Sequence, residues 1–146
     1  MKKILILVIA VSFLSFILPN NEETCSLTIK VKELRNSKGV VQFALYNEEG
    51  SIPDEDYKKY YKKDIAIIKN NASSITFNNL PKGIYAINIL HDEDENGQIA
   101  KKFILPKEGI GFSNYTSLGF SNKPKFSKAS FELNSNMTKI IKIVYM

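Results

Sequence analysis

The sequence predicts an all-β fold, a single antiparallel β-sandwich of about seven strands with one long functional-looking loop. Short segments that alternate apolar and polar residues are separated by turns rich in Asn, Ser and Gly. After the N-terminal segment, no long apolar stripe has the 3.6-residue period of a helix. No internal repeat, low-complexity tract or interdomain linker divides the 146 residues, so we expect one domain.

The N-terminus is typical of a secretory signal peptide. Two lysines precede an uncharged run from Ile4 to Leu18, and a polar segment follows it. Because this run is shorter than the about 20 residues that span a bilayer, cleavage is favoured over the alternative, an uncleaved membrane anchor. We expect residues 1–24 to be a signal peptide, with no A-x-A motif to mark the cleavage point, and residues 25–146 to form the sandwich. The protein is then periplasmic or secreted.

The cysteine and histidine counts exclude several kinds of site. One Cys excludes an intrachain disulfide framework and a Cys-rich zinc site, and one His excludes multi-His metal sites. Cys25 lies at the start of the expected domain, but Glu23 and Thr24 precede it, where a bacterial lipoprotein has a small residue after an aliphatic one. We therefore expect a free thiol or a packing residue at this position rather than a lipid anchor.

The charge balance argues against nucleic acid as a partner. Without Lys2 and Lys3 the chain has 18 basic and 15 acidic residues, a net charge of +3, and most of its lysines are scattered. The densest basic group lies within residues 57–63, where four lysines are interleaved with three tyrosines. It predicts a short amphipathic loop helix that covers a sheet edge; the alternative is a polyanion-binding surface.

The first two predicted strands form a hairpin. Segment 26–34 alternates apolar and polar residues with period two, which indicates a half-buried strand. Residues 35–39 contain Asn, Ser and Gly and are typical of a turn. Segment 40–46 is predicted to be the second strand, with every second residue from Val41 on one face.

The remaining predicted strands are shorter or more apolar. Residues 47–64 are a polar excursion for which we expect one or two helical turns. Segment 84–90 is nearly all apolar, which predicts a central strand buried on both faces. A turn at 134–136 separates the two strands of a last hairpin. Besides 84–90, the expected later strands are 65–69, 74–77, 130–133 and 139–145.

A local pattern, F-x-x-L-P-x-G-x-Y, lies between two of these strands. We expect Phe77 and Leu80 to be in the core and Pro81 to fix the backbone of the turn. Gly83 is expected to adopt a backbone geometry closed to other residues, and Tyr85 to bury its ring while its hydroxyl holds the loop. The pattern resembles the corner of prealbumin-like and Ig-like sandwiches, which host unrelated functions.

The stretch from 91 to 128 has little strand pattern, and connections of this length are often functional. Asp92, Asp94 and Asn96 occupy positions 1, 3 and 5 of a D-x-D-x-N-G pattern, with Gly97 at position 6. This is the first half of an EF-hand calcium loop, in which alternate oxygen ligands surround one Ca²⁺. The three residues are therefore candidate metal ligands, and Ca²⁺ is the candidate cofactor.

The second half of that calcium pattern is missing. Phe103 stands at position 12, where a bidentate Glu belongs, and Ala100 stands at position 9. A closing carboxylate would have to come from elsewhere, for instance Glu108 or Glu93. The alternative is an acidic Asn-Gly turn that needs no metal.

Other residues of this stretch are candidates for ligand binding. His91, at the end of the central strand, is either a structural residue that holds the loop or the base of a small hydrolase that works with a neighbouring carboxylate. Aromatic residues further along either pack the loop onto the sandwich or line a groove. The candidate ligand-binding residues are His91, Glu108, Phe112, Ser113 and Asn114.

The order of motifs resembles a bacterial family of exported proteins known as domain of unknown function 2141 (DUF2141). The resemblance spans about residues 26 to 145 and implies export and the sandwich fold, but no established activity. The family often has K-[LM]-D-T-N after Gly97, whereas this chain reads Gln-Ile-Ala-Lys-Lys, which removes one potential oxygen ligand. The matching pieces are residues 34–39, 44–47, 80–86, the H-D-x-x-x-N-G loop at 91–97, and 106–114.

We therefore interpret the chain as an exported β-sandwich of the cell envelope. The first hypothesis is a non-enzymatic binding or structural module with its site on the 91–122 loop, which a cation could stabilise. The second is the small hydrolase that uses His91, and the third is an accessory in transport or surface assembly. The expected partner is an envelope protein or a small ligand, with no nucleic acid and with membrane contact only through the signal peptide.

Overall fold

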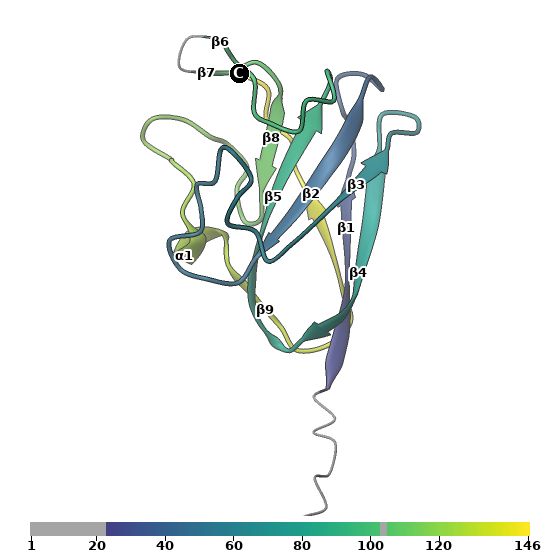
Figure 1. The fold of residues 1–146 in the computed structure, drawn as a ribbon, viewed down its shortest axis with the longest axis vertical. Helices are drawn as coiled ribbons and strands as arrows, with labels where there is room; N and C mark the ends of the chain where they lie inside the picture. Colours follow the sequence, from purple (N-terminus) through teal and green to yellow (C-terminus); the bar gives the residue numbers. More distant parts are fainter. Residues whose placement is uncertain (1–22, 103–104) are drawn as a thin grey trace, which may run out of the picture.

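The computed structural model describes residues 23–102 and 105–146, and it confirms the all-β sandwich. One sheet has the order β10-β1-β4 and the other has the order β3-β2-β5-β8 (Figure 1). Most of the expected signal peptide lies outside the described residues. The strands of the first sheet are β1 (Thr24–Val31), β4 (Ser73–Pro81) and β10 (Met137–Ile141), and those of the second are β2 (Val40–Tyr46), β3 (Lys62–Ile67), β5 (Gly83–Asp92) and β8 (Gly109–Phe112). A short strand, β9 (Phe131–Leu133), also pairs with the start of β5.

The facing sides of the two sheets form an aliphatic and aromatic interior, which we call the inner core. Leu27 and Ile29 of β1 and Phe43 of β2 are completely buried in it, as is Ile89 of β5. The period-two pattern predicted this side of β1 and β2 correctly, because alternate residues of a strand point to opposite faces of its sheet. Burial of such side chains is the main stabilising contribution to the sandwich.

The predicted corner between β4 and β5 is confirmed except at its glycine. Phe77, Leu80 and Tyr85 are buried, and the Tyr85 hydroxyl donates a hydrogen bond to the carbonyl oxygen of Pro81 at 2.8 Å. Gly83 has no positive φ; the left-handed residue of this corner is Asn79, with φ of 54°. Asn adopts the left-handed conformation more readily than most residues. The prediction therefore assigned the unusual backbone conformation of this corner to the wrong residue, Gly83 instead of Asn79.

Neither predicted hairpin forms. β1 pairs with β10 and β4, whereas β2 pairs with β3 and β5, so the turn at 35–39 carries the chain from one sheet to the other. β9 and β10 likewise lie in different sheets. In addition, β10 runs parallel to β1, so the sandwich is not wholly antiparallel. Apolar alternation indicates which side of a strand is buried but not which strand pairs with it. The hairpins were inferred from turn-forming residues between consecutive strands, and this inference was wrong.

The expected helical turns in the polar excursion are absent from described residues 47–61. The carboxylate of Asp54 accepts hydrogen bonds from the backbone N–H groups of Lys58 and Lys59, at 3.0 and 2.7 Å, and from the Tyr46 hydroxyl at 3.1 Å. Tyr57 has φ of 51°, which a helix does not allow. The segment is therefore a compact loop wrapped around a buried carboxylate, and Tyr57 is buried rather than displayed among the lysines.

The stretch from 91 to 128 contains more regular structure than expected. It includes a small pair of strands, β6 (Lys101–Lys102) with β7 (Leu105–Pro106), then β8 and part of a short helix, α1 (Phe126–Ala129). β8 was missed because Gly109 and Gly111 weaken its strand pattern. A Cβ at Gly111 would lie 2.6 Å from the carbonyl oxygen of Lys142, so the glycine allows the C-terminal segment to lie against β8.

Loops cover the outer face of the sheet that contains β3, β2, β5, β8 and β9, the face turned away from the inner core. We call this covering the outer layer. Loop 47–61 and the segment 113–130 lie on the same side of β2, β5 and β8 in Figure 1. Side chains of both segments pack on the sheet, which explains why β5 is buried on both faces, as predicted, after its first two residues. Among the described residues, no helix is long and apolar enough to cross a membrane. The buried apolar residues of the outer layer are Ala44, Tyr46, Ile52, Tyr57, Ala86, Leu90, Ile110, Phe112, Tyr115, Phe126 and Ala129.

Candidate functional site

The acidic loop begins at the last residue of β5. Asp92 is almost completely buried, and its two carboxylate oxygens accept hydrogen bonds from the backbone N–H groups of Asn96 at 3.1 Å and Gly97 at 2.8 Å. Gly97 has φ of 75°, which closes this turn and favours glycine. The side-chain oxygen of Asn96 accepts a hydrogen bond from the N–H of Gln98 at 2.7 Å. The D-x-D-x-N-G segment therefore folds into a tight turn that is held by its own side chains.

A third carboxylate reaches this turn from the far side of the β6-β7 excursion. Glu108 is buried, and its oxygens accept hydrogen bonds from the N–H groups of Glu93 at 2.8 Å and Ala100 at 3.3 Å. One oxygen each of Asp92, Asp94 and Glu108 lies within 4.8 Å of the others. Two oxygens on opposite sides of a Ca²⁺ ion are about 5 Å apart, so the spacing fits a single hard cation.

The electrostatics of this acidic cluster, Asp92, Asp94 and Glu108, also suit a cation. Burial is the main cause that raises the pKa of Asp92, and the nearby charge of Asp94 raises it further. The two backbone N–H donors act in the opposite direction but do not outweigh burial. A bound divalent cation would offset the repulsion between these carboxylates, and their oxygens are the ligands that Ca²⁺ and Mg²⁺ prefer.

Glu93, the alternative closing carboxylate, is engaged elsewhere. Its oxygens accept hydrogen bonds from the guanidinium of Arg35, and Asn36 also donates to it. These contacts, with Arg35 the largest cause, lower the pKa of Glu93 to about 2. The pair joins the acidic loop to the turn at 35–39 and leaves Glu108 as the carboxylate that faces Asp92 and Asp94.

His91 points to the opposite side of the sheet from Asp92. It is completely buried, its Nδ1 lies 2.7 Å from the Tyr145 hydroxyl, and its Nε2 lies 3.0 Å from the carbonyl oxygen of Lys38. Because a carbonyl only accepts, Nε2 carries a hydrogen and donates it to Lys38; in the neutral imidazole Nδ1 then accepts from the Tyr145 hydroxyl. Both ring nitrogens therefore hold the end of the sandwich together.

Three further candidate residues, Phe112, Ser113 and Asn114, lie at the end of β8 and the start of segment 113–130. Phe112 is buried in the outer layer, with its ring 6.0 Å from that of Tyr115. The Ser113 hydroxyl donates to the carbonyl oxygen of Ala129 at 2.6 Å and accepts from the N–H of Ile87 at 2.9 Å. Asn114 donates to backbone carbonyls of residues 128–130. Ser113 and Asn114 thus fasten α1 to the sheet, and only Glu108 of the ligand-binding candidates joins the acidic cluster.

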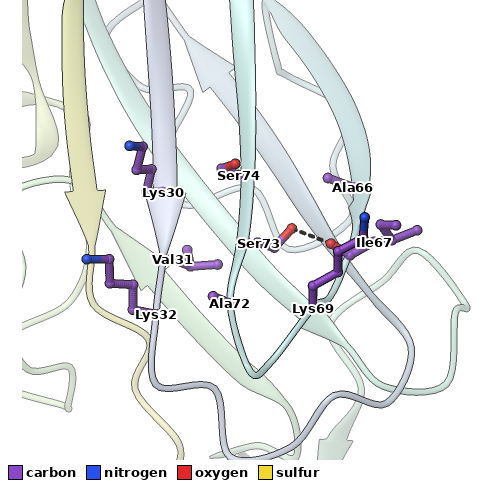
Figure 2. Close-up of a pocket in the computed structure, with 9 residues that line it drawn as sticks. All are labelled: Lys30, Val31, Lys32, Ala66, Ile67, Lys69, Ala72, Ser73 and Ser74. Carbon is purple, nitrogen blue, oxygen red and sulfur yellow. Dashed lines mark hydrogen bonds between the residues drawn. The ribbon is translucent and has the colours of Figure 1, made fainter.

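Two of the cavities on the described part of the molecule bear on the search for a site. One, of about 460 Å³, lies where β3 separates from β4, and Figure 2 shows its residues. The side chains of Lys30 and Lys32 point away from that of Lys69, and the Ser73 hydroxyl donates to the carbonyl oxygen of Ile67. No charged groups converge in it, so it offers no evident site.

The second cavity, of about 350 Å³, opens through the outer layer above β5 and β8. Asn88 of β5 lines it and is completely buried. Within the described residues, the side-chain Nδ2 of Asn88 and both polar side-chain atoms of Gln42 have no partner within hydrogen-bond distance. Sequence reasoning missed both residues, although each is a polar residue between apolar ones on the outer side of its strand.

Comparison with protein families gives one match. The model of a family described as an uncharacterised protein conserved in bacteria (DUF2141) matches residues 29–141. A comparison with curated proteins found no match, and neither did a comparison with solved structures. The matched range covers every strand except the first five residues of β1, all three residues of the acidic cluster, and the lining of the cavity above β5 except Met146.

Proposed function

The chain belongs to DUF2141, a family of uncharacterised bacterial proteins, and we propose that it is a non-enzymatic binding module of the cell envelope. In this proposal the protein is exported, and a divalent cation, Ca²⁺ in the first place, fixes the loop that carries the binding surface. The observation that carries the proposal is the convergence of Asp92, Asp94 and Glu108 from two separate segments.

The position of the acidic cluster indicates what a cation would do there. Asp92 is the end of the central strand, whereas Glu108 directly precedes β8. A cation held by both would tie the start of the 91–108 excursion to its end and so fix the loop beside the outer layer. Backbone carbonyls and water would supply the remaining ligands, since Ca²⁺ takes six to eight oxygens.

The export part of the proposal is supported by the sequence. The basic start, the apolar run from Ile4 to Leu18 and the polar segment after it are typical of a signal peptide. Extracellular and periplasmic compartments also contain enough Ca²⁺ to occupy sites of moderate affinity. Export and a calcium-stabilised loop are therefore compatible.

A thermal unfolding experiment tests the cation. Millimolar Ca²⁺ should raise the melting temperature of the wild-type protein by several degrees, because a ligand that binds only the folded state stabilises it and each kcal/mol is worth about 4 °C. Asp94→Asn should abolish most of this shift, since Asp94 is exposed and its replacement leaves the packing intact.

The matched control is Glu95→Gln, which removes the same charge from an exposed neighbour in the same loop. This variant should keep the full shift. A wild-type melting temperature that stays constant with millimolar Ca²⁺ and Mg²⁺ would contradict the cation, as would an equal loss of the shift in both variants.

Mass spectrometry tests the export. The full chain is expressed in a bacterial host and recovered from the periplasm or medium, where its mass should correspond to removal of about the first 24 residues. Recovery of the uncleaved chain from the cytoplasm would contradict export, and an uncleaved chain in the membrane fraction would favour the anchor.

A further inference from the structure

We propose that the 350 Å³ cavity above β5 and β8 binds a small, neutral and largely apolar molecule that presents a carbonyl oxygen to Asn88. This inference rests on the proposed binding function and names the class of ligand. It involves a different set of side chains from the cation, so the two can fail separately.

The cavity has the size and shape of a ligand site. Its floor is the outer face of β5 and β8, and its walls come from loop 47–61, from Ile99, Lys101 and Pro106, and from the 118–124 segment. Pockets for small molecules begin at about 300 Å³, so the space suits a molecule of one or two rings. Because Ile99, Lys101 and Pro106 lie between Asp92 and Glu108 in the chain, the proposed cation would also steady this side of the cavity.

Most of the lining is apolar. Ile110 and Phe112 form part of the floor, and Leu118 and Phe120 form part of the wall. The Phe120 side chain is 74% exposed, the largest exposure among the described large hydrophobic residues. A ring left in water at the mouth of an apolar cavity gains burial when a ligand lies against it. The lining therefore favours an apolar body in the ligand.

One hydrogen-bond donor in the floor determines the polar part of the ligand. The Asn88 side-chain oxygen accepts from the Tyr57 hydroxyl at 3.4 Å, but Nδ2 finds no acceptor in the described part of the chain. A buried donor without a partner is costly, and folded proteins retain few of them. A carbonyl oxygen of a bound molecule would accept from Nδ2 without bringing a charge into the sheet.

The charges around the cavity favour a neutral ligand over an anion. Asp54 is buried in the wall and accepts three hydrogen bonds, so it presents a carboxylate towards this side of the outer layer. Glu55 pairs with Lys101 at the rim, which leaves little free positive charge there. With Lys123, the four charged residues of the lining sum to zero. A ligand carboxylate would have to approach Asp54 after losing its water.

Fluorescence of the neutral naphthyl ketone Prodan tests the proposal, because its emission moves to shorter wavelength in an apolar site. The protein purified after expression of the full chain should bind it saturably. Phe120→Ala should weaken binding about tenfold, since it removes the exposed ring from the mouth. Ile140→Ala is the control: Ile140 is 63% exposed but lies on β10 in the other sheet, so binding should not change. Equal affinities of Phe120→Ala and the wild type would overturn the site.

Two competitors with the same ring system test the ligand class without any change in the protein. 2-Acetonaphthalene, a neutral ketone, should displace Prodan. The anion 2-naphthoate should need a concentration at least about tenfold higher for the same displacement. Equal competition would overturn the preference for a neutral ligand.

Asn88→Asp tests the hydrogen bond, after circular dichroism has shown that the variant folds. It replaces the donor by an acceptor and should weaken Prodan about tenfold. The affinity for N-phenyl-1-naphthylamine, a neutral dye without a carbonyl, should fall much less. If the affinities for both dyes fall equally, Asn88 does not recognise the carbonyl. If the variant does not fold, the Phe120→Ala and competition results decide.

The cation and the cavity can be rejected separately. The calcium-dependent shift in melting temperature is measured without a dye, so its absence together with intact Prodan binding would reject only the cation.

Discussion

The two faces of the central strands differ in what they contain. On the inner face, β2 and β5 contribute Phe43 and Ile89 to an interior of aliphatic and aromatic side chains. On the outer face, the same two strands carry Gln42, Asn88 and Asp92, all buried. The inner face therefore stabilises the fold mainly by packing, whereas the outer face, besides the apolar residues of the outer layer, retains buried polar groups that cost stability and that a ligand or cation can use.

The largest effect should come from the inner core. Phe43→Ala should lower the free energy of unfolding by about 3–5 kcal/mol, because it removes a fully buried ring and leaves a cavity between the sheets. Chemical denaturation measures this loss. Ile140→Ala, an exposed position on β10, should change the same quantity by less than about 0.5 kcal/mol. Similar losses in both variants would mean that the inner core is not the main source of stability.

The second prediction concerns the contact between β8 and the C-terminal segment. In Gly111→Ala the new methyl group would lie 2.6 Å from the carbonyl oxygen of Lys142, so the segments must separate, at a cost of about 1–3 kcal/mol. Gly119→Ala is the control, because a Cβ there has no neighbour within 4 Å. Thermal unfolding should show a lower melting temperature only for Gly111→Ala. An unchanged value would mean that the C-terminal segment moves away without cost.

The third substitution should increase the free energy of unfolding, whereas the first decreases it. Gln42→Met should raise the free energy of unfolding by about 1 kcal/mol, because the described residues offer no partner for either polar atom of the Gln42 side chain and Met has a similar volume. Gln98→Met, at an exposed position, is the control and should have little effect. A destabilised Gln42→Met protein would show that Gln42 is satisfied, for instance by water, and that the outer face is less costly than the comparison suggests.

The difference between the faces also explains how much the sequence could predict. The inner core follows from alternation, which is why the burial of Leu27, Ile29 and Phe43 was predicted correctly. The acidic turn was predicted from its spacing, but its third carboxylate, Glu108, lies 14 residues beyond Asp94 in the chain. That contact depends on the pairing of β8 with β5, which the glycines of β8 concealed.

The outer layer could not be predicted for a related reason. Its residues come from loops whose path is set by side chains that bind backbone groups, such as Asp54. Alternation carries no information about such contacts. Asn88 stands within an apolar strand, and only the loops above it decide whether it has a partner. Strand pattern therefore predicts the face that stabilises the fold better than the face that we propose to be functional.

The smallest effect concerns the contact that joins the acidic loop to the turn at 35–39. Because the pKa of Glu93 is lowered from 4.5 to about 2, its ionised form stabilises the folded protein above pH 4.5, and this contribution is lost as the pH falls towards 2. Arg35→Ala removes the main cause, so it should cost roughly 1 kcal/mol at neutral pH, where Arg35 is partly exposed to solvent, and progressively less as the pH falls through this window. Lys82→Ala breaks the more exposed pair with Glu23 and should cost little at any pH. A pH-independent cost of Arg35→Ala would instead assign its role to packing on the Tyr145 ring, 4.7 Å away.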